Sequence, residues 1–273
     1  MNKFLNAIIT IAARDFTKFI KDKNRIIAAF IFPAIFTGIL GSANQANLGA
    51  AAGFDFLLFT FLGSMSNTMF TNTTQGIVSL LEDRDNDFAQ EMFVAPISRL
   101  SIILGKITGE TMIAVVMLIT QFLLVFLLGI KFDFTKLIFM FPFLILIAIL
   151  GGAMGLVMIS LLKTQKAANQ IFGLIIFPQF FLAGIFSPVK DLPLPLLVLS
   201  RIVPLTYAVD LIRNLYYFEY HNLVDLFSFQ ILPTVAAKPV LFPLALDLTV
   251  VLAYTIIFIA VGMTVFIRSE KNK

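Results

Sequence analysis

Residue types that carry chemistry are scarce in this sequence of 273 residues. It contains no Cys and a single His, His221, which excludes disulfides, cysteine nucleophiles and multi-histidine metal sites built by this chain alone. Charged residues make up 13% of the chain and apolar residues 59%. A soluble enzyme or a nucleic-acid-binding domain could not cover so much apolar surface with so few charges. We therefore expect a membrane protein with lipid around it, no catalytic residue, no metal site and no nucleic-acid partner.

One segment concentrates charge. Residues 82–106 contain five acidic side chains, namely Glu82, Asp83, Asp85, Asp87 and Glu91. Asp87, with Gln90 three residues later, resembles the start of a helix. Phe88, Met92 and Phe93 would form its apolar stripe, and Pro96 would end it. The pattern predicts a short amphipathic helix that either rests on lipid headgroups or docks a partner protein.

The pair Gly105-Lys106 is the nearest approach to a phosphate-binding loop. Such a loop needs a glycine five residues before this glycine and Ser or Thr after the lysine. Leu100 and Ile107 occupy these positions, so we expect no ATP hydrolysis by this motif.

Six runs without charge are long enough to cross a bilayer, because about 20 apolar residues span its hydrocarbon core. They are Ile26–Phe54, Phe56–Leu81, Thr111–Ile130, Leu137–Leu162, Ala167–Val189 and Leu248–Ile267. An even number of spans puts both termini on one side. The opposite side then holds Lys131, Lys136, Lys190, Arg201, Arg213 and Lys238, and the other 14 of the 20 Lys and Arg lie with the termini. The positive-inside rule places that side, and both termini, in the cytoplasm.

Two further segments do not span. In residues 1–25, apolar residues recur at spacings of three and four, which predicts an amphipathic helix in the cytoplasmic interface. Residues 187–217 contain four prolines between two short apolar pieces and are too broken to cross the membrane.

Polar residues gather on one face of the second expected span, where they are Ser64, Asn67, Thr68, Thr71, Asn72 and Gln75. Amides facing lipid are costly, so this face must point inward, either to bond neighbouring helices or to line a substrate path. Our path candidates are Asn67, Thr71 and Gln75, with Gln170, Gln179 and Phe181 of the fifth span. In the fourth span, the spacing of Gly151 and Gly155 favours close helix packing.

Ionisable residues are absent from the middle of these runs. Asp55 and Glu110 lie near span ends, where we expect them to act as interfacial anchors. A proton-coupled carrier would need ionisable groups in mid-span. A secondary transporter or channel is therefore the weaker alternative to a pump, and an intramembrane enzyme is weaker still.

Two stretches resemble the ABC type-2 exporter permeases. EDRDNDFAQEMFVAPISRLSIILGK, from Glu82 to Lys106, is similar to the family's cytoplasmic signature. FPQFFLAGIFSPVKDLPLPLLVLSRIVPLTYAVDLIR, from Phe177 to Arg213, is similar to its second conserved stretch. The likeness covers nearly the whole chain and is nearest to the drug-resistance and polysaccharide-export branch. Asn86-Asp87, where many relatives carry glycine, and the long segment 220–246 depart from the pattern.

The resemblance implies an all-α membrane protein with six transmembrane helices and one permease domain over residues 1–273. Two identical subunits would pair, each with a separate ATPase subunit that holds ATP and Mg, so this chain would bind no cofactor. Residues 82–106 would form the coupling loop, with contacts from Arg84, Asp87, Phe88, Glu91, Met92 and Phe93. Residues 187–217 would form external re-entrant helices. The chain would lie in the cell membrane and export a drug-like, lipid-like or glycan substrate.

Overall fold

The computed structural model describes residues 3–81, 98–162, 164–217 and 240–271, and every regular element in these ranges is helical. The first half contains α1 (Lys3–Lys21), α2 (Lys23–Ile35), the π-helical turn η1 (Phe36–Gly41), α3 (Ser42–Ala52), α4 (Phe56–Val78) and α7 (Arg99–Leu127). The second half contains α8 (Thr135–Leu161), α9 (Gln165–Leu182), the 3-10 turn η2 (Val189–Asp191), α10 (Leu194–Ser200), α11 (Pro204–Tyr217) and α13 (Leu244–Lys271).

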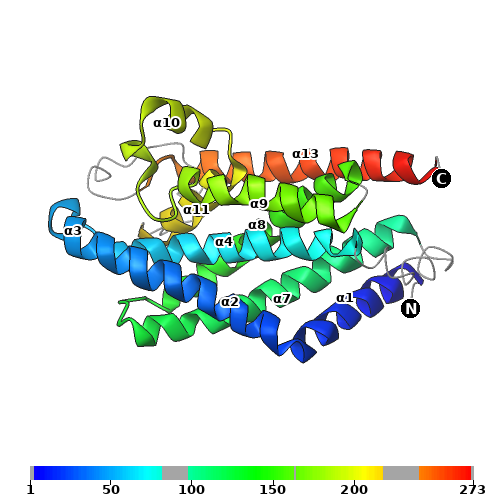
Figure 1. The fold of residues 1–273 in the computed structure, drawn as a ribbon, viewed down its shortest axis with the longest axis horizontal. Coiled ribbons are helices and arrows are strands. Elements are labelled where there is room, and N and C mark those ends of the chain that lie inside the picture. Colours follow the sequence, from blue (N-terminus) through cyan, green and yellow to red (C-terminus); the bar gives the residue numbers. More distant parts are fainter. Residues whose placement is uncertain (1–2, 82–97, 163, 218–239, 272–273) are drawn as a thin grey trace.

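The long helices run along one axis of an elongated bundle (Figure 1). At one end α1 begins, α4 ends, α7 begins and α13 ends, whereas α3 and α10 lie at the opposite end. Both ends of the described chain therefore lie on the same side of the bundle, as an even number of crossings requires.

Within the residues that the structure describes, four segments are long and apolar enough to cross a membrane. These are Lys23–Asn47, Leu100–Leu127, Thr135–Leu161 and Leu244–Phe266. A fifth arises if α10 and α11, bent by 83° at their junction, count together as one span. The second and fifth expected spans do form helices, α4 and α9, but their Asn, Gln, Ser and Thr residues make them less apolar than these four. The structure thus confirms an all-helical, multi-pass membrane protein.

The start of α7 corrects two expectations. Residues 99–106, expected in a loop, form the first turns of this helix, because Ser98 caps it by accepting a hydrogen bond from the backbone N–H of Ser101 at 3.1 Å. The candidate span accordingly begins at Leu100 instead of Thr111. Lys106 and Glu110 therefore lie inside it.

The central pair of helices, α4 and α8, approaches closely at the two glycines of α8. A Cβ atom on Gly155 would lie 2.6 Å from the carbonyl oxygen of Thr74, and one on Gly151 would overlap the carbonyl oxygen of Phe70. The Thr74 hydroxyl donates to the Gly151 carbonyl at 2.9 Å. The predicted close packing at Gly151 and Gly155 is confirmed.

The N-terminal helix α1 packs along the first turns of α7. A Cβ on Gly105 would lie 3.0 Å from the Cβ of Ile11, and one on Gly109 would lie 3.0 Å from the Cα of Ala12. Gly105, which resembled part of a phosphate loop, therefore serves helix packing. Phe19 is buried, whereas Leu5 is exposed, so α1 divides its apolar residues between α7 and its outer face.

The helix α11 is buried along nearly its whole length, from Pro204 to Tyr216. Residues 187–217 thus form short helices on either side of a sharp bend, as expected, but the second of them is an internal element packed on α4, α8 and α13.

Candidate functional site

A cavity of about 660 Å³ lies among α1, α2, α4, α7 and α9. The polar face of α4 forms one wall, with Asn67, Thr68, Thr71, Asn72, Gln75 and Ser79. Aromatic rings of α2 and α9 form another, with Phe32, Phe172, Phe177 and Phe180. The cavity is therefore amphipathic, with amides and hydroxyls on one side and phenyl rings on another.

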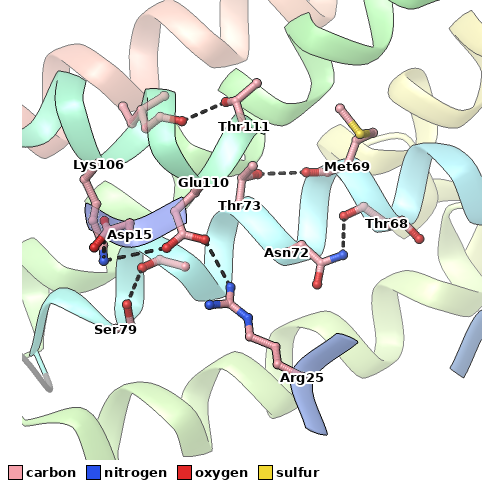
Figure 2. Close-up of polar contacts among 12 residues, drawn as sticks. Asp15, Arg25, Thr68, Met69, Asn72, Thr73, Ser79, Lys106, Glu110 and Thr111 are labelled. Atoms are coloured by element: carbon pink, nitrogen blue, oxygen red, sulfur yellow. Dashed lines mark hydrogen bonds and ion pairs between the residues drawn. The ribbon is translucent and has the colours of Figure 1, made fainter. Parts of the chain in front are cut away.

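The polar residues of α4 divide into two groups. Thr73 and Thr74 are buried, and their hydroxyls donate to backbone carbonyls of α4 and, at Thr74, of α8. Thr71 and Asn72, in contrast, border the cavity, where the Asn72 amide donates to the Thr68 carbonyl at 2.9 Å (Figure 2). Helix bonding and cavity lining, the two interpretations of this polar helix, thus each apply to part of it.

Asn67 differs from its neighbours on this wall. Within the described part of the chain, its buried Oδ1 accepts no hydrogen bond. Because a buried acceptor without a partner is costly, an acceptor facing a cavity is a natural contact for a hydrogen-bond donor of a ligand. Gln75, nearer the end of the same wall, is exposed to the cavity.

Charged residues close one end of the cavity. Asp15, Arg25, Lys106 and Glu110, here named the Glu110 cluster, join α1, α2 and α7 (Figure 2). The Lys106 ammonium lies 2.9 Å from the Asp15 carboxylate and 3.6 Å from that of Glu110. Arg25 reaches Glu110 from α2 with an Nη2–Oε2 distance of 3.1 Å.

Burial differs within the Glu110 cluster. The side chains of Asp15, Lys106 and Glu110 are at most 4% exposed, whereas that of Arg25 is 32% exposed. The expected role of Glu110 as an interfacial anchor is wrong, because the residue is buried and ion-paired. A buried carboxylate is tolerable only when cations and hydrogen-bond donors surround it, as they do here.

The sequence of the chain matches a known family of transport proteins. The profile of the family described as "ABC-2 type transporter" matches residues 6–217. This chain belongs to the ABC-2 type transporter family. It is also 24% identical over 217 residues to a protein of Cyanophora paradoxa named "Putative transport permease ycf38", an alignment that covers 78% of this chain and 75% of the relative. The chain is therefore a membrane permease of the ABC-2 type, a family whose members generally pair with ATPase subunits.

The structure places the other predicted site residues of this permease apart from the cavity. Gln170 and Phe181 are exposed on α9. Gln179 is buried, and within the described residues its Oε1 has no hydrogen-bond partner. None of these three lines the cavity. The predicted coupling residues, namely Arg84, Asp87, Phe88, Glu91, Met92 and Phe93, lie outside the described residues.

A second buried polar cluster of the permease lies at the other end of the bundle, between α11 and the start of α13 (Figure 1). We name it the Asp210 cluster; its members are Asp210, Arg213, Asn214 and Asp247. The Asp210 carboxylate accepts hydrogen bonds from the backbone N–H groups of Leu241 at 2.9 Å and Phe242 at 2.7 Å. The Asn214 amide donates to the Asp247 carboxylate at 2.7 Å.

Arg213 extends the Asp210 cluster to α4. Its Nη2 donates to the carbonyl of Phe59 at 3.2 Å and to that of Ile185 at 3.1 Å, and its guanidinium stacks on the Phe59 ring. The sequence analysis assigned no role to this cluster. The spacing of Asp210 and Arg213 on one face of an otherwise apolar helix was the available signal.

Proposed function

We propose that this permease is the transmembrane subunit of an ATP-driven exporter, in which cargo leaves the cytoplasm along the polar face of α4. The observation that carries the proposal is the cavity of about 660 Å³ with amides and hydroxyls inside an otherwise apolar bundle. A cavity of this size suits a drug-sized molecule or the headgroup of a larger amphiphile.

In this proposal α4 and α9 complete six spans. The polar residues of α4 face the cavity or α8, so this helix can lie at membrane depth without exposing amides to lipid. The excess of Lys and Arg on the side of the chain ends orients both termini toward the cytoplasm of the cell membrane.

A second copy of this chain is the proposed partner in the membrane. Large apolar residues on the outer faces of α2 and α9 flank the cavity and are exposed, among them Ile31, Phe32, Leu174 and Phe177. Pairing through these faces would join two cavities into one path between the subunits. Lipid would cover the remaining apolar surface.

The ATPase subunit, which would hold ATP and Mg, is proposed to dock on residues 82–106. The likeness of this segment to the family signature supports the contact roles of Arg84, Asp87, Phe88, Glu91, Met92 and Phe93. α4 ends shortly before this segment and α7 begins within it at Arg99, and these helix ends lie at one end of the bundle together with the start of α1 (Figure 1).

The cargo is proposed to be a hydrophobic drug-like, lipid-like or glycan molecule. The phenyl rings opposite the amides of α4 favour a molecule with both an apolar and a hydrogen-bonding part. Gln170, Gln179 and Phe181 would contact it only outside this cavity.

The test is reconstitution of the permease in vesicles with and without a candidate ATPase subunit from the same organism. We expect ATP-dependent export of amphiphilic cargo that is lost when Asn67 and Gln75 are both replaced by Leu. The control is Leu123→Ala, since Leu123 is an exposed residue of α7 that does not line the cavity. Transport driven by an ion gradient with no ATPase present would instead establish the alternative, a secondary transporter.

A further inference from the structure

The helix α2 is joined to α1 through a short break at Asp22. Asp22 lies between the two helices, and its carboxylate caps α2 by accepting a hydrogen bond from the backbone N–H of Arg25 at 3.1 Å. Arg25 therefore lies in the first turn beyond the break. Farther along α2, Ala28, Phe32 and Pro33 line the cavity, so a movement of α2 about Asp22 changes the width of the cavity.

Glu110, in contrast, belongs to the closely packed unit of α1 and α7. It lies against Gly76 of α4, where any larger residue would overlap its carboxylate. Gly105 and Gly109 hold α7 against α1 on the adjoining turns. The α1–α7 unit is thus packed through backbone contacts on which no side-chain rearrangement can act.

Two kinds of contact join these two parts. Ile26 of α2 packs on the apolar cluster of Phe19, Ile113 and Met117, and Arg25 forms an ion pair with Glu110 at 3.1 Å and lies over the Phe19 ring. Lys106 lies closer to Asp15, at 2.9 Å, than to Glu110, at 3.6 Å, so Arg25 is the nearer counter-ion of Glu110. Arg25 is also the member of the Glu110 cluster that solvent reaches, since its side chain is 32% exposed. Its guanidinium can leave Glu110 and be hydrated, whereas the buried carboxylate cannot.

We propose that the Arg25–Glu110 ion pair is a latch that holds α2 against α7, narrows the end of the cavity beside α1, and opens during the transport cycle. This inference rests on the proposed exporter function and assigns Arg25 as a positioning residue that acts through Glu110. Glu110 belongs to α7, which begins directly after residues 82–97. A movement of the start of α7 would therefore shift Glu110 away from or toward Arg25 of α2. The latch thereby links the proposed docking segment to the cavity.

The natural absence of cysteine from the chain allows a direct test. Ser79 lines the cavity at the end of α4, near Glu110, and Ser79→Cys would introduce a single thiol there (Figure 2). The rate at which a water-soluble maleimide labels this thiol in the purified permease measures how often the cavity end is open. We expect Arg25→Ala to raise this rate up to about fivefold, because loss of a partly exposed ion pair shifts such an equilibrium by about that factor.

Three variants serve as comparisons on the same Ser79→Cys background. Arg25→Lys keeps the charge and should restore most of the slow labelling. Lys21→Ala removes a positive charge from the exposed end of α1 and should label at the parental rate. Glu110→Gln removes the other half of the latch and should label as fast as Arg25→Ala.

Labelling of Arg25→Ala at the parental rate would overturn the latch, as would equal acceleration by Lys21→Ala. Size-exclusion chromatography and thermal unfolding of each variant separate opening from misfolding, and an unfolded Arg25→Ala protein would overturn it in favour of a purely structural ion pair. Because the labelling needs no ATPase subunit, its outcome is independent of whether ATP drives transport. With the ATPase subunit present, we expect Arg25→Ala to keep ATP hydrolysis but to lose much of the cargo export.

Discussion

The Glu110 cluster and the Asp210 cluster both bury charge near the ends of the bundle, but they satisfy it differently. In the Asp210 cluster, backbone groups supply much of the bonding, as in the two N–H groups that Asp210 accepts and the two carbonyls that Arg213 reaches. In the Glu110 cluster, side-chain charges from three helices satisfy one another. Arg213 is 3% exposed, whereas the Arg25 side chain is 32% exposed.

This difference separates a structural lock from a movable contact. Backbone carbonyls and N–H groups cannot rotate away, so the Asp210 cluster fixes α11 to α4 and to the start of α13. Arg25 belongs to α2, which is separated from α1 by the interruption of the helix at Asp22, and it borders the cavity. We therefore expect substitutions in the Asp210 cluster to reduce stability and those of Arg25 and Glu110 to alter transport.

Arg213→Ala should have the largest effect on stability. It leaves Asp210 buried without its neighbouring cation and leaves the carbonyls of Phe59 and Ile185 without their donor, so we expect a loss of about 3–5 kcal/mol in the free energy of unfolding. Thermal unfolding in detergent and the yield of folded protein measure this loss. Arg201→Ala, at an exposed position after α10, is the matched control and should behave as the wild type.

Asp210→Ala should be the next most severe change. The N–H groups of Leu241 and Phe242 lose their acceptor, and each unpaired buried donor costs about 1–3 kcal/mol. Asp191→Ala removes an exposed carboxylate on the same side of the bundle and should change stability by less than about 0.5 kcal/mol. Equal unfolding temperatures for these two variants would show that Asp210 does not stabilise the packing of α11 against the start of α13.

The contrast between the clusters could be predicted only in part from the sequence. The charge-free runs locate the helices, and the glycine spacing in α8 predicts the contact with α4, because both depend on residues close together in the chain. Lys106 and Glu110 lie four residues apart on one helix, but Arg25 pairs with Glu110 from 85 positions earlier and Asp15 pairs with Lys106 from 91 positions earlier. No local periodicity links these distant partners. The burial of α11 was missed because the prolines and short apolar pieces of residues 187–217 predicted external re-entrant helices, and the packing of α11 on α4, α8 and α13 depends on residues far away in the sequence.

Lys106→Met tests whether the buried members of the Glu110 cluster contribute as little to stability as we expect of Arg25. The Lys106 side chain is 4% exposed and bridges Asp15 and Glu110, so its loss leaves two carboxylates with less compensation. We expect a loss of about 1–3 kcal/mol in stability, less than for Arg213→Ala, because Arg25 still compensates the Glu110 carboxylate. Thermal unfolding measures it, with Lys166→Met, at an exposed position of α9, as a control. A loss as large as that of Arg213→Ala would assign Lys106 to the rigid part.

Arg25→Ala should have the smallest effect on stability, below about 1 kcal/mol, since a partly exposed ion pair contributes little. The prediction is sharp because Arg25 and Arg213 carry the same group, each bound to a buried acceptor from another segment, and differ in exposure and in the kind of partner. Paired thermal unfolding of Arg25→Ala and Arg213→Ala measures the difference directly. If Arg25→Ala unfolds as easily as Arg213→Ala, α2 is part of the fixed core, and the cavity must then change its width through α9 instead of through α2.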